Sequence, residues 1–103
     1  DNGGPVAVTN CRNTPLRGAK GQVYEGGVRV PFVVSWPAQL KPGTFDQPVS
    51  SLDVFPTAVA VGGGDAPRNP KLDGVDLLPH LRGESKESLA DRTLFWRTGG
   101  GQN

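Results

Sequence analysis

The pattern of apolar and polar positions predicts three ordered elements, separated by polar stretches rich in glycine and proline. An apolar run, bounded by prolines, predicts a buried strand at residues 30–35; it consists of Val28, Val30, Phe32, Val33 and Val34. Apolar residues at helical spacing predict a helix over residues 52–61, with Leu52, Phe55 and Val59 facing inward. A shorter apolar run at residues 93–96 is typical of another strand.

The local sequence also predicts where the helix begins and ends. Ser50 is a suitable N-cap, and Asp53 stands three residues later, where its carboxylate can bond back to the cap. Pro56 is tolerated only near the first turn, which agrees with a start at Ser50 or Ser51. Three glycines at residues 62–64 predict the end of the helix.

Residues 16–31 form the most unusual stretch of the chain. Four glycines lie among Arg17, Lys20, Glu25 and Arg29. Because glycine permits positive φ angles and close backbone approach, this segment is expected to be a shaped loop. A charged loop beside a rigid element is a common place for a functional site, although a solvated turn with ordinary surface charges explains the same pattern.

Composition and charge exclude several classes of protein. The 103 residues include 15 Gly and 10 Pro, which favours loops and turns over long helices. The net charge is +1, with basic and acidic residues interspersed, so a nucleic-acid partner is not expected. No apolar run reaches the length of a membrane span, and a single cysteine excludes an internal disulfide. The first residues show no targeting pattern, and we expect a chain that starts mid-protein.

Several motifs, taken in order, resemble the type I sulfatases. These are formylglycine-dependent sulfuric ester hydrolases of the alkaline phosphatase-like superfamily. The similarity begins with DNGG at residues 1–4, PLRGAKG at 15–21 and YEGGVRVP at 24–31. It continues with WP at 36–37, PVSSLD at 48–53, FPT at 55–57, LDGV at 72–75 and RTLFW at 92–96.

The resemblance implies an α/β fold class and a fragment of the alkaline phosphatase-like sulfatase fold. Residues 1–83 would be the late part of the catalytic domain, and residues 84–103 the start of a smaller C-terminal domain. The implied partners are a sulfate ester substrate and the remainder of the sulfatase chain. The family resemblance also implies a periplasmic, secreted or lysosomal-type location.

The same resemblance implies a calcium site at the start of the chain. In this family an Asp-Asn pair contributes to calcium binding in the active centre, and the pair corresponds to Asp1 and Asn2. A carboxylate and an amide carbonyl are hard oxygen ligands of the kind Ca²⁺ prefers. Since six or more oxygens are needed, the remaining ligands and the formylglycine are expected outside this chain. An Asx-turn at a chain end is the alternative.

Lys20 matches the family lysine that contacts the sulfate group of the substrate. Cleavage of a sulfate ester builds negative charge on the oxygens around sulfur, which a fixed ammonium stabilises. The alternative is a solvated surface lysine. Glu25 and Arg29 are expected to support the glycine loop behind Lys20 as a buried ion pair, or else to point to solvent.

Two residues invite a functional role that the sequence does not support. Cys11 begins the text CRNTP, which fails the family's modification motif, Cys-x-Pro-Ser-Arg or Cys-x-Ala-Ser-Arg, at the third to fifth positions. Cys11 is therefore interpreted as an incidental loop thiol. His80, the one histidine, stands among leucines and is interpreted as structural.

The expected function is hydrolysis of sulfate esters by a longer protein, with this chain inactive alone. One alternative is a phosphatase or phosphonate hydrolase of the same superfamily, because sulfate and phosphate esters share geometry and developing charge. The upstream nucleophile would separate them: Cys or Ser for a sulfatase, Thr for a phosphoesterase. The other alternative is a non-catalytic, β-rich interaction module, favoured by the absence of a nucleophile and of an acid–base pair.

Overall fold

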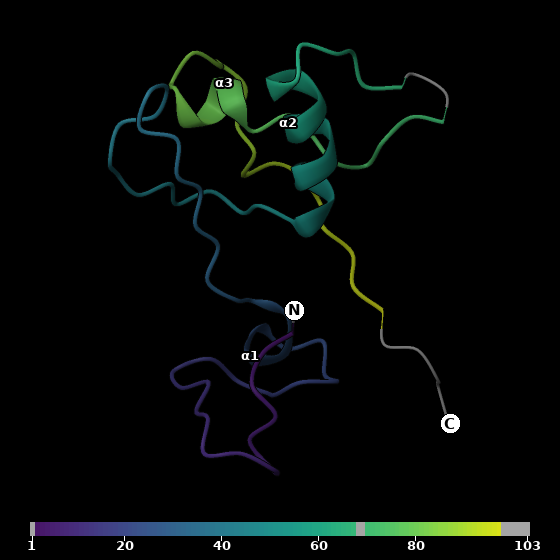
Figure 1. The fold of residues 1–103 in the computed structure, drawn as a ribbon. Helices are drawn as coiled ribbons and strands as arrows, with labels where there is room; N and C mark the ends of the chain where they lie inside the picture. Colours follow the sequence, from purple (N-terminus) through teal and green to yellow (C-terminus); the bar gives the residue numbers. More distant parts are fainter. Residues whose placement is uncertain (1, 68–69, 98–103) are drawn as a thin grey trace. The chain divides into compact units, whose positions relative to one another are not determined.

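The computed structural model describes residues 2–67 and 70–97, whose ordered elements are all short helices (Figure 1). They are α1 (Glu25–Val28), the 3₁₀ helix η1 (Ser51–Asp53), α2 (Val54–Val61) and α3 (Leu78–Leu81). The chain divides into two compact units. One contains the described residues of Asp1–Val34 and Phe95–Asn103, and the other those of Ser35–Leu94.

The first unit is held together by backbone packed closely on backbone. Gly26 and Gly27 of α1 are buried, and a Cβ at Gly27 would overlap the carbonyl oxygen of Gln22. The amide of Gly26 donates to the carbonyl of Arg17 at 2.7 Å, and the amide of Gly3 donates to the carbonyl of Gly27 at 2.9 Å. Only glycine permits this approach, so the glycines of the loop are a structural requirement.

In the second unit, the predicted helix is confirmed as η1 followed directly by α2. The predicted capping box is present: Ser50 Oγ accepts from the amide of Leu52 at 3.3 Å, and Asp53 Oδ2 accepts from the amide of Ser50 at 2.7 Å. The helix ends at Gly62, and the amide of Gly64 donates to the carbonyl of Val59 at 3.0 Å. Both boundaries follow from local sequence, as predicted.

The inner face of this helix differs from the predicted one. Leu52 and Phe55 are exposed, at 58% and 55%, whereas Asp53 and Pro56 are buried. The helix is rotated because Asp53 and Thr57 both bond to later parts of the chain. These bonds turn the Asp53 side of the helix inward and leave the apolar side open.

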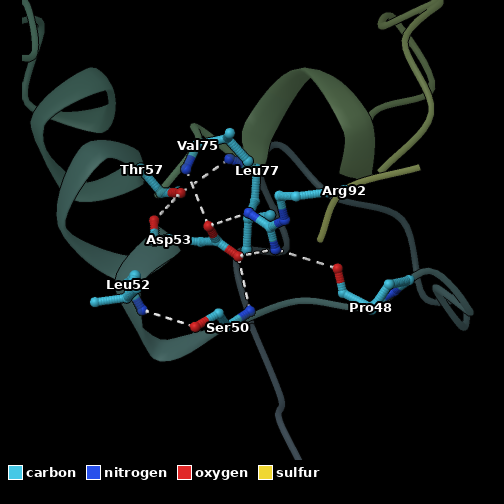
Figure 2. Close-up of polar contacts among 8 residues, drawn as sticks. All are labelled: Pro48, Ser50, Leu52, Asp53, Thr57, Val75, Leu77 and Arg92. Atoms are coloured by element: carbon cyan, nitrogen blue, oxygen red, sulfur yellow. Dashed lines mark hydrogen bonds and ion pairs between the residues drawn. The ribbon is translucent and has the colours of Figure 1, made fainter. Parts of the chain in front are cut away.

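Asp53 is the centre of the second unit (Figure 2). Its carboxylate is 0% exposed, and it accepts from the amide of Val75 at 2.9 Å. The guanidinium of Arg92 donates to both carboxylate oxygens, at 2.6 and 2.8 Å. Thr57 adds a bridge, donating to the carbonyl of Asp53 at 2.6 Å and accepting from the amide of Leu77 at 2.9 Å. The helix is thereby tied to residues 22 and 39 positions further along the chain.

These bonds change the pKa of Asp53. Burial alone would raise it, but the hydrogen bonds from Arg92 and from the amides of Ser50 and Val75 outweigh burial and lower the pKa below its usual value. The same pairing raises the pKa of Arg92. Leu77 and Leu89 are the buried hydrophobic side chains of the described residues, so this charged cluster sits beside a very small apolar core.

The predicted strand at residues 30–35 is wrong. This segment has no regular structure, and no β-strand occurs in residues 2–67 or 70–97. Val33 is 87% exposed, and Phe32 is also exposed. An apolar run shows a tendency toward burial, but a strand also needs a neighbouring strand for its N–H and C=O groups. The described residues provide none. Residues 93–96 are irregular for the same reason, with Phe95 exposed.

Of the predicted α/β class, the described residues therefore show helices alone. Residues 78–81, just before Gly83, form the short helix α3. A helix able to cross a membrane does not occur among the described residues. The division into domains at residues 83 and 84 remains a prediction.

Candidate active site in the glycine loop

Lys20 lies in a turn of the first unit, and its side chain is exposed. Its backbone amide donates to the carbonyl of Gly4 at 3.3 Å. This bond joins the loop that carries Lys20 to the segment that follows Asn2. Two regions that the sequence singled out separately are therefore neighbours in one compact unit.

The loop around Lys20 has the shape expected of its glycines. Gly18 and Gly21 have φ angles of 93° and 89°, a region that other residues rarely occupy. Between them the amide of Ala19 donates to the side-chain oxygen of Gln22 at 3.0 Å. The predicted shaped loop is confirmed, with Lys20 between two left-handed glycines.

Asn13 is a residue that sequence reasoning missed. Its Oδ1 accepts from the amide of Gly4 at 3.0 Å, and its Nδ2 donates to the carbonyls of Gly4 and Gly18, at 3.0 and 3.1 Å. One side chain thus bonds to both segments of the site. Asparagine often bonds to backbone in turns, but the sequence alone cannot indicate partners nine residues away.

Arg17 and Tyr24 form a second contact that the sequence did not indicate. The guanidinium of Arg17 lies 4.0 Å from the centre of the Tyr24 ring and donates to its hydroxyl at 3.1 Å. Tyr24 is the residue before α1, so this contact joins the loop to the start of that helix. It places a second cation on the loop that carries Lys20.

Glu25 and Arg29 do pair, at 3.3 Å, across α1 from its first residue to the residue that follows it. The prediction of a buried pair behind Lys20 is wrong, because both side chains are exposed. An exposed ion pair at this spacing contributes only about 0.3–0.5 kcal/mol. The glycine backbone supports the loop far more than this pair does.

Of the two candidate calcium ligands, one lies among the described residues. Asp1 lies outside the described residues, and Asn2 is exposed at the start of the first unit. The described residues contain no group of three or more His, Cys, Asp or Glu side chains that could hold a metal. Asn2 offers a hard amide oxygen, which suits Ca²⁺, but one such ligand supplies a small part of the six to eight that Ca²⁺ takes. Asp1 and Asn2 therefore fit the chemistry of a calcium site without completing one.

The structure gives Cys11 and His80 local environments. The half-buried thiol of Cys11 shares a hydrogen bond with Thr9 Oγ1 at 2.6 Å. His80 lies in α3 of the second unit, where its carbonyl accepts from the amide of Gly83 at 3.1 Å. Neither contact suggests a chemical role.

Comparison with known proteins places the loop in context. A family model described as Sulfatase matches residues 1–64, which include Asn2, Asn13 and Lys20. This chain belongs to the sulfatase family. Steryl-sulfatase of Mus musculus is 47% identical over 77 residues, covering 74% of this chain and 12% of the relative. Arylsulfatase A of Bos taurus is 48% identical over 81 residues, covering 79% and 15%.

A bacterial relative extends the similarity to nearly the whole chain. The uncharacterized sulfatase YdeN of Escherichia coli strain K12 is 36% identical over 98 residues, or 95% of this chain and 17% of the relative. The sulfatase similarity therefore reaches beyond the residues that the family model matches. The chain spans 12–17% of the length of these three relatives.

Proposed function

We propose that this chain is part of an enzyme that hydrolyses sulfate esters, with Lys20 contacting the sulfate group. The observation that carries the proposal is the bond between the Lys20 amide and the Gly4 carbonyl, within the region matched to sulfatases. It brings the lysine loop beside the segment that carries the candidate metal ligands. The ammonium of Lys20 beside a bound cation would suit a sulfate ester, whose three terminal oxygens share a negative charge.

Lys20 has a definite chemical task in this proposal. As the ester bond breaks, negative charge grows on the sulfate oxygens, and the ammonium of Lys20 stabilises that charge. The bonds from the amides of Ala19 and Lys20 hold the loop, so little reorganisation is needed when substrate arrives. The guanidinium of Arg17, held against Tyr24, adds positive potential to the same loop.

Asp1 and Asn2 would hold calcium in this proposal. A bound Ca²⁺ would balance the charge of the sulfate group, and a formylglycine would supply the nucleophile. The remaining ligands and the nucleophile would come from the remainder of the sulfatase chain, in keeping with the share of its relatives that this chain spans. We accordingly expect these 103 residues to be inactive alone.

The rest of the protein would also cover apolar surface that the chain leaves open. Phe32 and Val33 in the first unit, and Leu52 and Phe55 in the second, are exposed large hydrophobic side chains. Burying such side chains contributes about 1.5–3 kcal/mol each.

The experiment compares two esters of the same leaving group. The complete protein containing this chain is given 4-nitrophenyl sulfate and 4-nitrophenyl phosphate, before and after removal of calcium with a chelator. We expect a higher kcat/KM for the sulfate ester, lost on chelation and restored by added Ca²⁺. A higher kcat/KM for the phosphate ester would favour the phosphoesterase alternative, and hydrolysis of neither would overturn the proposal.

A further inference from the structure

We propose that Asn13 is a positioning residue, which sets the Lys20 loop in register with the segment that follows Asn2. This inference rests on the proposed function, because it assigns Asn13 to the same site. Asn13 is separated from Asn2 and Lys20 in sequence, yet its side chain bonds beside both of them. It acts on the reaction through other residues and does not itself contact substrate.

The side chain of Asn13 uses both of its donors and its acceptor oxygen. Its amide oxygen accepts one bond, and its amide nitrogen donates two. Oδ1 accepts from the amide of Gly4 while Nδ2 donates to the carbonyl of Gly4. The side chain thus makes the same pair of bonds with Gly4 that a paired backbone segment would make. Among side chains of this size, only a carboxamide can both accept and donate twice in this way.

The placement of these bonds relates the two candidate functional residues. Gly4 lies two residues after Asn2, and Gly18 lies two residues before Lys20. Asn13 bonds to both glycines, each at 3.0–3.1 Å. A movement of either segment relative to the other therefore breaks bonds to Asn13.

Other bonds maintain the first unit if Asn13 is lost. The amide of Gly3 donates to Gly27, the amide of Gly26 donates to Arg17, and the amide of Lys20 donates to Gly4. We therefore expect loss of Asn13 to shift the two segments, not to unfold the unit. Small displacements of catalytic groups are costly, since about 1 Å of misplacement can lower a rate about 10²-fold.

The test uses the complete enzyme and three variants. Asn13→Ala removes all three bonds, while Asn13→Asp keeps the size of the side chain and one acceptor but loses both donated bonds. The matched control is Asn10→Ala, an exposed asparagine of the same loop. The readouts are kcat and KM for 4-nitrophenyl sulfate, the Kd for Ca²⁺ alone by titration calorimetry, and circular dichroism.

We expect kcat to fall about 10–100-fold in both Asn13 variants, with KM nearly unchanged and Ca²⁺ affinity reduced. The control should match the wild type. Wild-type kcat and Ca²⁺ affinity in a folded Asn13→Ala or Asn13→Asp enzyme would overturn the inference, as would an equal loss in the control. Failure of both Asn13 variants to fold would also contradict it, because the remaining bonds should maintain the unit.

The same experiment distinguishes this inference from the proposed function. A wild-type enzyme that neither binds Ca²⁺ nor hydrolyses the sulfate ester refutes the proposed function and the inference with it. An active, calcium-binding wild type with unaffected Asn13 variants refutes only the role of Asn13.

Discussion

Replacing Arg92 with alanine should strongly destabilise the second unit. Asp53 is fully buried, and its carboxylate accepts four hydrogen bonds, two from Arg92 and one each from the amides of Ser50 and Val75. Arg92→Ala leaves a buried carboxylate with only the two backbone donors. Removing one partner of a buried ion pair typically costs about 3–5 kcal/mol, and the enclosed position of this pair supports that range.

Two further variants test the cause of this loss. Arg92→Lys keeps the positive charge but cannot donate to both carboxylate oxygens in the same planar arrangement, so an intermediate loss is expected. Lys86→Ala removes an exposed cation of the same unit and should change the unfolding free energy by less than about 0.5 kcal/mol.

The assay combines urea unfolding with amide hydrogen exchange in the complete protein. The amides of Ser50 and Val75 donate directly to Asp53, so their exchange reports on this cluster. A loss of 3–5 kcal/mol corresponds to roughly 10²–10⁴-fold faster exchange at these two amides. If Arg92→Ala exchanged at the wild-type rate and unfolded at the wild-type urea concentration, the ion pair would not stabilise the unit.

Two other predictions follow from the second unit. The pKa of Asp53 is lowered on folding, so its contribution to stability is present above the unfolded-state pKa of about 3.9 and is lost as the pH falls through the lower folded pKa. Melting temperatures between pH 7 and 2 should therefore fall more steeply in the wild type than in Asp53→Asn, and parallel curves would refute this. A Cβ at Gly74 would overlap the carbonyl of Leu52, whereas one at Gly43 meets open space. Gly74→Ala should cost about 1–3 kcal/mol and Gly43→Ala far less in urea unfolding, and equal losses would contradict the packing described.

The parts of the fold that sequence predicted are those that local chemistry determines. Ser50 and Asp53 of the capping box are only three positions apart, so its pattern is visible in sequence and was confirmed. The partner of Asp53 is Arg92, 39 positions away, and no local pattern indicates it. This distant pairing also turned the helix. Phe55, which helical spacing predicted to face inward, is therefore exposed.

The candidate site shows the same division. The glycines around Lys20 predicted a shaped loop, because a positive φ is a property of single residues. The bonds from Asn13 to Gly4 and Gly18 depend on how the chain folds back, so sequence did not predict them. The strand at residues 30–35 was wrong because strand formation depends on neighbouring strands as well as on apolar residues.

The most direct test of the central claim is the kinetics of Lys20→Ala in the complete enzyme. Losing one preorganised donor to developing charge typically costs about 10²–10³ in kcat, or roughly 3–4 kcal/mol. We expect that loss for 4-nitrophenyl sulfate with folding intact, poor rescue by Lys20→Arg because a planar guanidinium does not replace a compact ammonium, and near wild-type kinetics for the exposed control Arg12→Ala. Wild-type kcat in a well-folded Lys20→Ala enzyme would instead make Lys20 an ordinary surface lysine and contradict the proposed site.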